Sequence, residues 1–151
     1  MKVYLVRHGE ALPSNIDPER GLSPTGSMEV RLVAEELKNK ISSPPLAIYH
    51  SSKKRAVQTA GIMADVCAPG VTPEERDALL PDDDPHIWIE RIDKTEKDIM
   101  LVGHMPYMGI IAGALLSKSS GGRSVEFSTA TVACLEGGGK SFELCWVLRP
   151  S

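Results

Sequence analysis

The sequence predicts an α/β fold, a three-layer sandwich in which a mostly parallel sheet carries helices on both faces and ends in a C-terminal antiparallel hairpin. Two observations lead to this class. Continuous apolar runs, typical of strands buried on both faces, alternate with longer segments of helical spacing. Two apolar segments near the C-terminus flank a glycine-rich turn. The 151 residues are expected to form one domain spanning 1–151.

Three continuous apolar runs are expected to be the parallel strands, because a strand with one wet face would alternate apolar and polar residues. They cover residues 3–6, 46–49 and 99–102. Residues 71–75 are a further strand candidate, which Pro73 would shorten or confine to an edge of the sheet. Residues 130–135 and 142–148, on either side of the glycine-rich segment 136–140, are expected to form the hairpin.

The first helix is expected to begin at Ser23-Pro24, where serine can cap the helix and proline suits its first position. It should end near residues 42–45, which contain two prolines. Its spacing predicts that three residues lie near one face: Met28, Leu32 and Leu37.

A second helix is expected after Ser51 or Ser52, either of which could cap it, and should stop before Pro69-Gly70. Its apolar stripe consists of Ala56, Ala60, Met63 and Cys67. A third helix is expected after Pro106, and it carries Ile110, Ile111, Leu115 and Leu116.

Composition narrows the possible partners and compartments. The net charge of −3 provides no general positive field for nucleic acid or for an anionic membrane, so neither is an expected partner. The first apolar run is too short for a signal peptide and no run approaches a membrane span, which predicts a cytoplasmic protein. The cysteines Cys67, Cys134 and Cys145 are odd in number and lack C-x-x-C spacing, so buried reduced thiols are expected.

Arginines and histidines follow the ends of three predicted strands. Arg7-His8 follows the first strand, Arg55 lies one helical turn after the second, and His104 follows the strand at 99–102. Ligands of open α/β sheets bind beyond the carboxyl ends of the strands. These four side chains are therefore expected to meet at one edge of the sheet.

This set of side chains suits a phosphoryl group. Arginine donates paired hydrogen bonds to phosphate oxygens, and a helix N-terminus adds amide donors. A metal site is not expected, because adjacent arginines would repel a cation. A neutral imidazole can attack phosphorus and form a phosphohistidine that water then hydrolyses, while fixed cations stabilise the phosphoryl oxygens. Such chemistry requires no cofactor.

Three motifs carry a resemblance to a known family. The runs RHGEA at 7–11, SSKKRAVQTA at 51–60 and VGHMP at 102–106 resemble the histidine phosphatase superfamily, the phosphoglycerate-mutase-like group, and within it the SixA-type phosphohistidine phosphatases. The resemblance extends over essentially the whole chain. It implies that His8 is the nucleophile, that Arg7 and Arg55 hold the phosphoryl oxygens, and that His104 is the second histidine of the pocket.

Other polar residues have simpler interpretations. Ser51 and Ser52 are explained by capping, and Gln58 and Thr59 by helix packing and local hydrogen bonds. They are therefore not assigned to catalysis. The remaining histidines, His50 and His86, are expected to be structural or exposed.

Three aspartates between two prolines are expected to form a solvated turn. They are Asp82, Asp83 and Asp84. The resemblance gives them a second interpretation, because many relatives that cleave phosphate esters use an acidic residue in this part of the chain to protonate the leaving oxygen. One of the three is therefore a candidate general acid.

The absence of an unambiguous acid favours a phosphoramidate substrate, since a protonated imidazole nitrogen leaves readily whereas an alkoxide does not. A short chain has little material for a lid, so its pocket could admit a side chain of another protein. The expected function is a phosphatase acting on a histidine-phosphorylated protein domain. Two alternatives are a phosphomonoesterase for a small phosphorylated metabolite and a phosphate-recognising module without turnover. A mutase is disfavoured, because the chain is too short to shield its intermediate from water.

Overall fold

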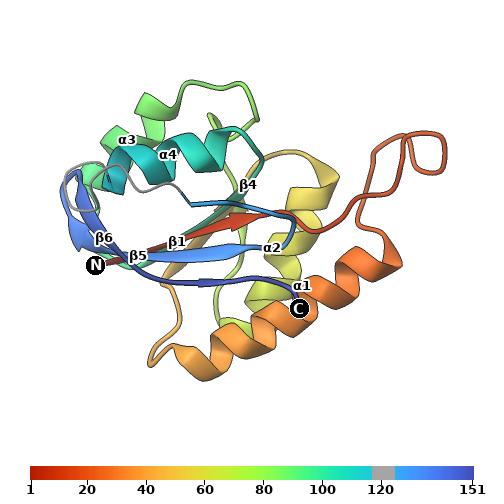
Figure 1. Cartoon of the computed structure of the whole chain (residues 1–151), viewed down its shortest axis with the longest axis horizontal. Helices are drawn as coiled ribbons and strands as arrows, with labels where there is room; N and C mark the ends of the chain where they lie inside the picture. Colours follow the sequence, from red (N-terminus) through yellow and green to blue (C-terminus); the bar gives the residue numbers. More distant parts are fainter. Residues whose placement is uncertain (117–124) are drawn as a thin grey trace.

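The computed structural model describes residues 1–116 and 125–151 and contains a six-stranded sheet in the order β3-β2-β4-β1-β5-β6 (Figure 1). The strands are β1 Lys2–Arg7, β2 Ala47–His50, β3 Glu74–Glu75, β4 Ile99–Gly103, β5 Val132–Gly138 and β6 Ser141–Leu148. The first four pair in parallel, while β5 runs antiparallel to β1 and β6 antiparallel to β5. The mostly parallel sheet with a C-terminal hairpin is confirmed.

Helices cover both faces of this sheet. They are α1 Pro24–Lys40, α2 Lys54–Cys67, α3 Pro85–Asp93 and α4 Tyr107–Leu116. Helices α1 and α2 pack on one face and α3 and α4 on the other (Figure 1). Each face of the sheet has its own hydrophobic core, and strand β1 contributes to both. Tyr4 and Val6 pack in the core beneath α1 and α2, and Val3 and Leu5 pack in the core beneath α3 and α4. This double burial explains why the strand is a continuous apolar run.

Helix α1 begins as predicted but buries a different face. Ser23 caps it, and the Ser23 side chain accepts a hydrogen bond from the amide of Gly26. Leu37 is fully buried, whereas Met28 and Leu32 are each 58% exposed, so that part of the prediction was wrong. At 3.6 residues per turn Met28 and Leu37 lie about two and a half turns apart, on opposite sides of the helix. The buried stripe consists of Val30, Val33, Ala34 and Leu37.

Helix α2 buries the predicted stripe of Ala56, Ala60, Met63 and Cys67. Its cap was predicted wrongly, because Lys53 occupies the N-cap position and makes no side-chain capping hydrogen bond. Helix α3 was not predicted, although Asp84 before Pro85 carries the signal: Asp84 is its N-cap and accepts a hydrogen bond from the amide of His86.

The predicted strand around Pro73 is confirmed as the two-residue edge strand β3. Of the three cysteines, Cys67 and Cys134 are buried as expected, but Cys145 is exposed on β6. Within residues 1–116 and 125–151, none of the helices has both the length and the apolar character that crossing a bilayer requires.

The segment after β1 fits tightly between α1 and α2. The amide of Gly9 donates to Thr59 Oγ1 at 3.1 Å, which ties this segment to α2. Gly26 lies against the backbone of Glu10, and a Cβ atom at Gly26 would lie 2.2 Å from the Glu10 carbonyl oxygen. The backbone that follows His8 is therefore fixed by close packing against both helices.

We expect Gly26→Ala to lower the free energy of unfolding by about 2 kcal/mol, because the added methyl group meets backbone that has no room to move. Gly61→Ala is the matched control, since Gly61 is also helical but has nothing within 4 Å of an added Cβ. Gly61→Ala should raise stability by up to about 1 kcal/mol. Urea denaturation of the two variants measures both effects, and equal stability of the two would contradict the tight fit.

Candidate active site

Two adjacent strands deliver the histidines. Strands β1 and β4 pair in parallel with Arg7 opposite Gly103, so His8 and His104 follow neighbouring strand ends. The amide of His8 donates to the carbonyl of Gly103 at 3.0 Å and extends the pairing by one residue. The centroids of the two imidazole rings are 5.1 Å apart.

The His8 ring is buried, 9% exposed, and its protonation pattern is fixed by one contact. Its Nδ1 lies 2.6 Å from the carbonyl oxygen of Gly9. A carbonyl only accepts hydrogen bonds, so Nδ1 carries the hydrogen. In the neutral ring, the lone pair then resides on Nε2.

The environment of His8 keeps the ring neutral. Burial, together with the positive charges of Arg55, Arg7 and Arg20, lowers the pKa of His8 to about 4, against the hydrogen bond to Gly9 that raises it. An imidazole with this pKa is unprotonated at neutral pH and can act as a nucleophile.

His104 is buried, 2% exposed, and its Nε2 lies 2.6 Å from the hydroxyl of Ser51, which is 1% exposed. Among the described residues, no group hydrogen-bonds the buried Nδ1 of His104. Burial, together with the neighbouring His8 ring and the positive charges of Arg55, Lys53 and Arg7, lowers the pKa of His104 to about 3. This ring too is neutral at neutral pH.

Arg7 and Arg55, the two predicted arginines, both place positive charge near the two histidines, since each lowers the pKa of both rings. The Nη1 atom of Arg7 donates to the carbonyl of Phe127 at 2.8 Å, while its buried Nε has no partner within the part of the chain that the structure describes. Arg55 belongs to the first turn of α2. Burial lowers the pKa of both guanidinium groups. The arrangement therefore offers positive charge and hydrogen-bond donors to an anion.

The three aspartates proposed as a general acid have other contacts. Asp84 caps α3, and hydrogen bonds from the amide and ring of His86 lower its pKa, which keeps it ionised. Asp83 accepts a hydrogen bond from the amide of Leu80 at 2.8 Å. Asp82 is exposed. A general acid needs a raised pKa, so the environment of Asp84 opposes that role.

The other polar residues mostly behave as expected. His50 is buried and its Nδ1–H donates to the carbonyl of Ser51, whereas His86 is exposed. Gln58 accepts a hydrogen bond from the amide of Leu22, and Thr59 accepts one from the amide of Gly9. Ser51, which was expected only to cap α2, instead contacts His104. The available signal was its place directly after β2, at the same sheet edge as His104.

The family model of the histidine phosphatase superfamily (branch 1) matches residues 3–80, which include Arg7, His8 and Arg55. No curated protein sequence matches the chain.

Several solved structures share the fold over nearly the full length. The protein histidine phosphatase SixA complexed with tungstate has a TM-score of 0.83 and 24% identity, over 99% of this chain and 97% of that chain. An Agrobacterium tumefaciens protein named for the phosphohistidine phosphatase SixA has a TM-score of 0.79 and 25% identity, over 99% and 97%. Phosphoserine phosphatase from Entamoeba histolytica, in complex with 3-phosphoglyceric acid, has a TM-score of 0.68 and 16% identity, over 97% and 95%.

The family match covers more than half of the chain, and the fold extends the similarity to the strand end that carries His104. The resemblance expected from the three sequence motifs is confirmed. This protein belongs to the histidine phosphatase superfamily.

Proposed function

We propose that the protein is a phosphatase that removes the phosphoryl group from a phosphorylated histidine of another protein, by way of a phosphohistidine at His8. One observation carries the proposal. His8 is neutral and donates its Nδ1–H to the Gly9 carbonyl, and among the described residues no group hydrogen-bonds its Nε2, which lies within the positive field of Arg7 and Arg55.

The reaction has two displacements at phosphorus. In the first, the lone pair of His8 Nε2 forms a bond to phosphorus while the bond between phosphorus and the substrate nitrogen breaks. That electron pair returns to the substrate nitrogen, and because the other ring nitrogen of the substrate already carries a proton, the substrate leaves as a neutral imidazole, which is a good leaving group. In the second, water attacks phosphorus, the bond to Nε2 breaks, and inorganic phosphate and neutral His8 result.

The fixed donors stabilise the charge that spreads over the phosphoryl oxygens in both steps. Arg7 Nε and His104 Nδ1 are buried without a protein partner among the described residues, and both suit these oxygens. Under this proposal the Ser51 hydroxyl donates to Nε2 of His104 and thereby keeps the hydrogen on Nδ1. The amide of Lys53 donates to the same Ser51 oxygen at 3.4 Å and so favours this orientation of the hydroxyl.

The choice of a phosphohistidine substrate depends on the leaving group. A phosphate ester needs an acid to protonate the leaving oxygen, and the lowered pKa of Asp84 argues against that candidate. The similarity to SixA, at a TM-score of 0.83, supports the same choice. The Entamoeba phosphoserine phosphatase, at a TM-score of 0.68, keeps a phosphomonoesterase for a small metabolite as the second candidate, with Asp82 or Asp83 as its acid.

The intermediate provides the first test. The phosphatase is incubated briefly with a phosphohistidine-containing protein labelled with ³²P, and the reaction is then quenched in alkali. Label should be found on the phosphatase itself, because phosphohistidine survives alkali and is lost in acid. His8→Ala should carry no label and should show no measurable hydrolysis, while the exposed His86→Ala should behave as the wild type.

The same preparations distinguish the rival functions when they are tested on small phosphate esters. Faster cleavage of esters than of phosphohistidine, reduced by Asp82→Asn or Asp83→Asn, would favour the phosphomonoesterase. Binding of phosphate without hydrolysis of either class would favour a module that only recognises phosphate.

The low pKa of His8 predicts an acid-sensitive fold. An unfolded histidine binds a proton near pH 6.5, while folded His8 binds it only near pH 4, so between these values the unfolded chain holds more protons. The free energy of unfolding should therefore fall as the pH is lowered from 6.5 to 4, and His8 alone should contribute up to about 3 kcal/mol of the loss. Urea denaturation of the wild type and of His8→Asn at several pH values measures this contribution. The free energy of unfolding should depend less steeply on pH in the variant than in the wild type. An NMR titration midpoint of His8 near 6.5 would refute the argument.

Ser51 is proposed as a positioning residue for His104. Ser51→Ala should lower kcat about tenfold with a smaller change in KM, the effect of losing one hydrogen bond that holds the ring. Nitrogen NMR of His104 should show hydrogen on Nδ1 in the wild type and a mixture of both tautomers in Ser51→Ala. Ser52→Ala is the matched control, because Ser52 is the exposed neighbour. An unchanged tautomer in Ser51→Ala would contradict the assignment.

A further inference from the structure

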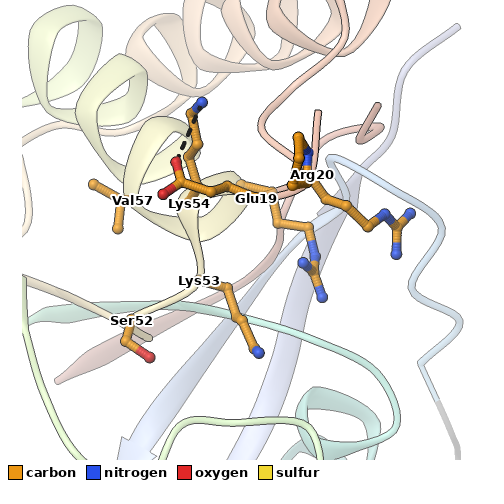
Figure 2. A pocket seen from close by; sticks show the side chains of 8 residues that line it. Glu19, Arg20, Ser52, Lys53, Lys54 and Val57 are labelled. Carbon is orange, nitrogen blue, oxygen red and sulfur yellow. Dashed lines mark ion pairs between the residues drawn. The ribbon is translucent and has the colours of Figure 1, made fainter. Parts of the chain in front are cut away.

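A cavity of about 670 Å³ lies beside the candidate active site, between the loop that precedes α1 and the first turn of α2 (Figure 2). Its charged lining consists of Glu19, Arg20, Lys53, Lys54 and Arg55. Because Arg55 also belongs to the candidate active site, the cavity borders the place where the phosphoryl group would bind. We call it the side cavity.

The charges of the side cavity do not cancel. Lys54 is neutralised, since its Nζ lies 3.1 Å from Asp17 and 3.6 Å from Glu19. Figure 2 shows the Lys54 ammonium group turned to Glu19 and the Lys53 side chain extended away from that pair. Within the described residues, neither Arg20 nor Lys53 forms an ion pair with a carboxylate. The cavity therefore presents uncompensated positive charge to a ligand.

The loop is built to hold Arg20 in place. Arg20 has a φ of 51°, in the left-handed region that a side chain other than glycine adopts at a cost of about 1 kcal/mol or more. Its Nε donates to the carbonyl of Leu12 at 3.0 Å. The Asp17 carboxylate accepts hydrogen bonds from the amides of Glu19 and Gly21 and braces the turn. Strained backbone that is held by such contacts is characteristic of functional positions.

The charge of Arg20 reaches the candidate active site. It lowers the pKa of Arg55 and contributes to the lowered pKa of His8. Like charges held close together are costly unless an anion lies among them. The whole chain carries a net charge of −3, so this concentration of positive charge is local.

We propose that the side cavity binds a carboxylate of the phosphorylated protein, with Arg20 and Lys53 as the recognising cations, so that the enzyme selects phosphohistidines flanked by acidic side chains. The inference rests on the proposed function and specifies its substrate. A singly charged carboxylate fits better than a second phosphoryl group, because Glu19 lines the same cavity and would repel a dianion more strongly. The planar fork of Arg20 also matches the two oxygens of a carboxylate.

Two phosphohistidine peptides test the proposal, identical except that one has glutamates and the other glutamines on both sides of the phosphorylated residue. The wild type should prefer the glutamate peptide about fivefold in kcat/KM at low salt, the size expected of two partly exposed ion pairs. The preference should shrink at high salt. Lys53→Gln and Arg20→Gln should each reduce it, and Arg20→Lys should retain most of it because the charge remains.

Lys97→Gln is the matched control. Lys97 is exposed and precedes β4, so it lies at the end of the sheet opposite to the candidate active site, and this variant should keep the full preference. Equal cleavage of the two peptides by the wild type would overturn the proposal. So would an equal loss on both peptides in Arg20→Gln and Lys53→Gln, which would assign these cations to the phosphoryl group itself.

Binding separates this proposal from the proposed function. The dissociation constants of both peptides for His8→Ala, measured by calorimetry, should show the same fivefold preference, and adding Lys53→Gln to that variant should reduce it. Failure of the wild type to hydrolyse either peptide would refute the proposed function, while the binding preference would still decide the role of the side cavity. Equal dissociation constants for the two peptides would overturn that role.

Discussion

The parallel pairing of β1 with β4 is the constraint on which the candidate active site depends. The pairing places Arg7 opposite Gly103, and the hydrogen bond from the His8 amide to the Gly103 carbonyl carries it one residue further. Both strands are buried on both faces, so a shift in register would disturb two cores at once. The distance between His8 and His104 is thus set by the packing of the whole molecule and not by the loops that carry them.

The two histidines are controlled by different partners. The Gly9 carbonyl accepts the Nδ1–H of His8, whereas the Ser51 hydroxyl hydrogen-bonds Nε2 of His104. Among the described residues, neither Nε2 of His8 nor Nδ1 of His104 has a hydrogen-bond partner. Burial lowers the pKa of both rings, and neighbouring positive charge lowers it further. A site with this much positive charge can therefore keep its histidines neutral, which a nucleophilic imidazole requires.

Much of the fold could be predicted because the sequence signals for its strands and helix ends are local. Double burial makes β1, β2 and β4 continuous apolar runs, and Ser23-Pro24 marks the start of α1 through capping chemistry. Predictions failed where apolar residues lie away from the protein core. Met28 and Leu32 are apolar but exposed, and the sequence alone does not say which face of α1 meets the sheet.

The sequence by itself determined that Arg7, His8, Arg55 and His104 follow strand ends at one edge of an α/β sheet, because strand type and direction follow from burial patterns and connections. Only the tertiary structure decided the partners of these residues. Ser51 contacts His104 across 53 positions of sequence, and the left-handed backbone of Arg20 is held by a loop that folds back on itself. Such contacts depend on distances between segments that no local pattern encodes. The contacts of Ser51 and Arg20 are therefore seen only in the folded chain.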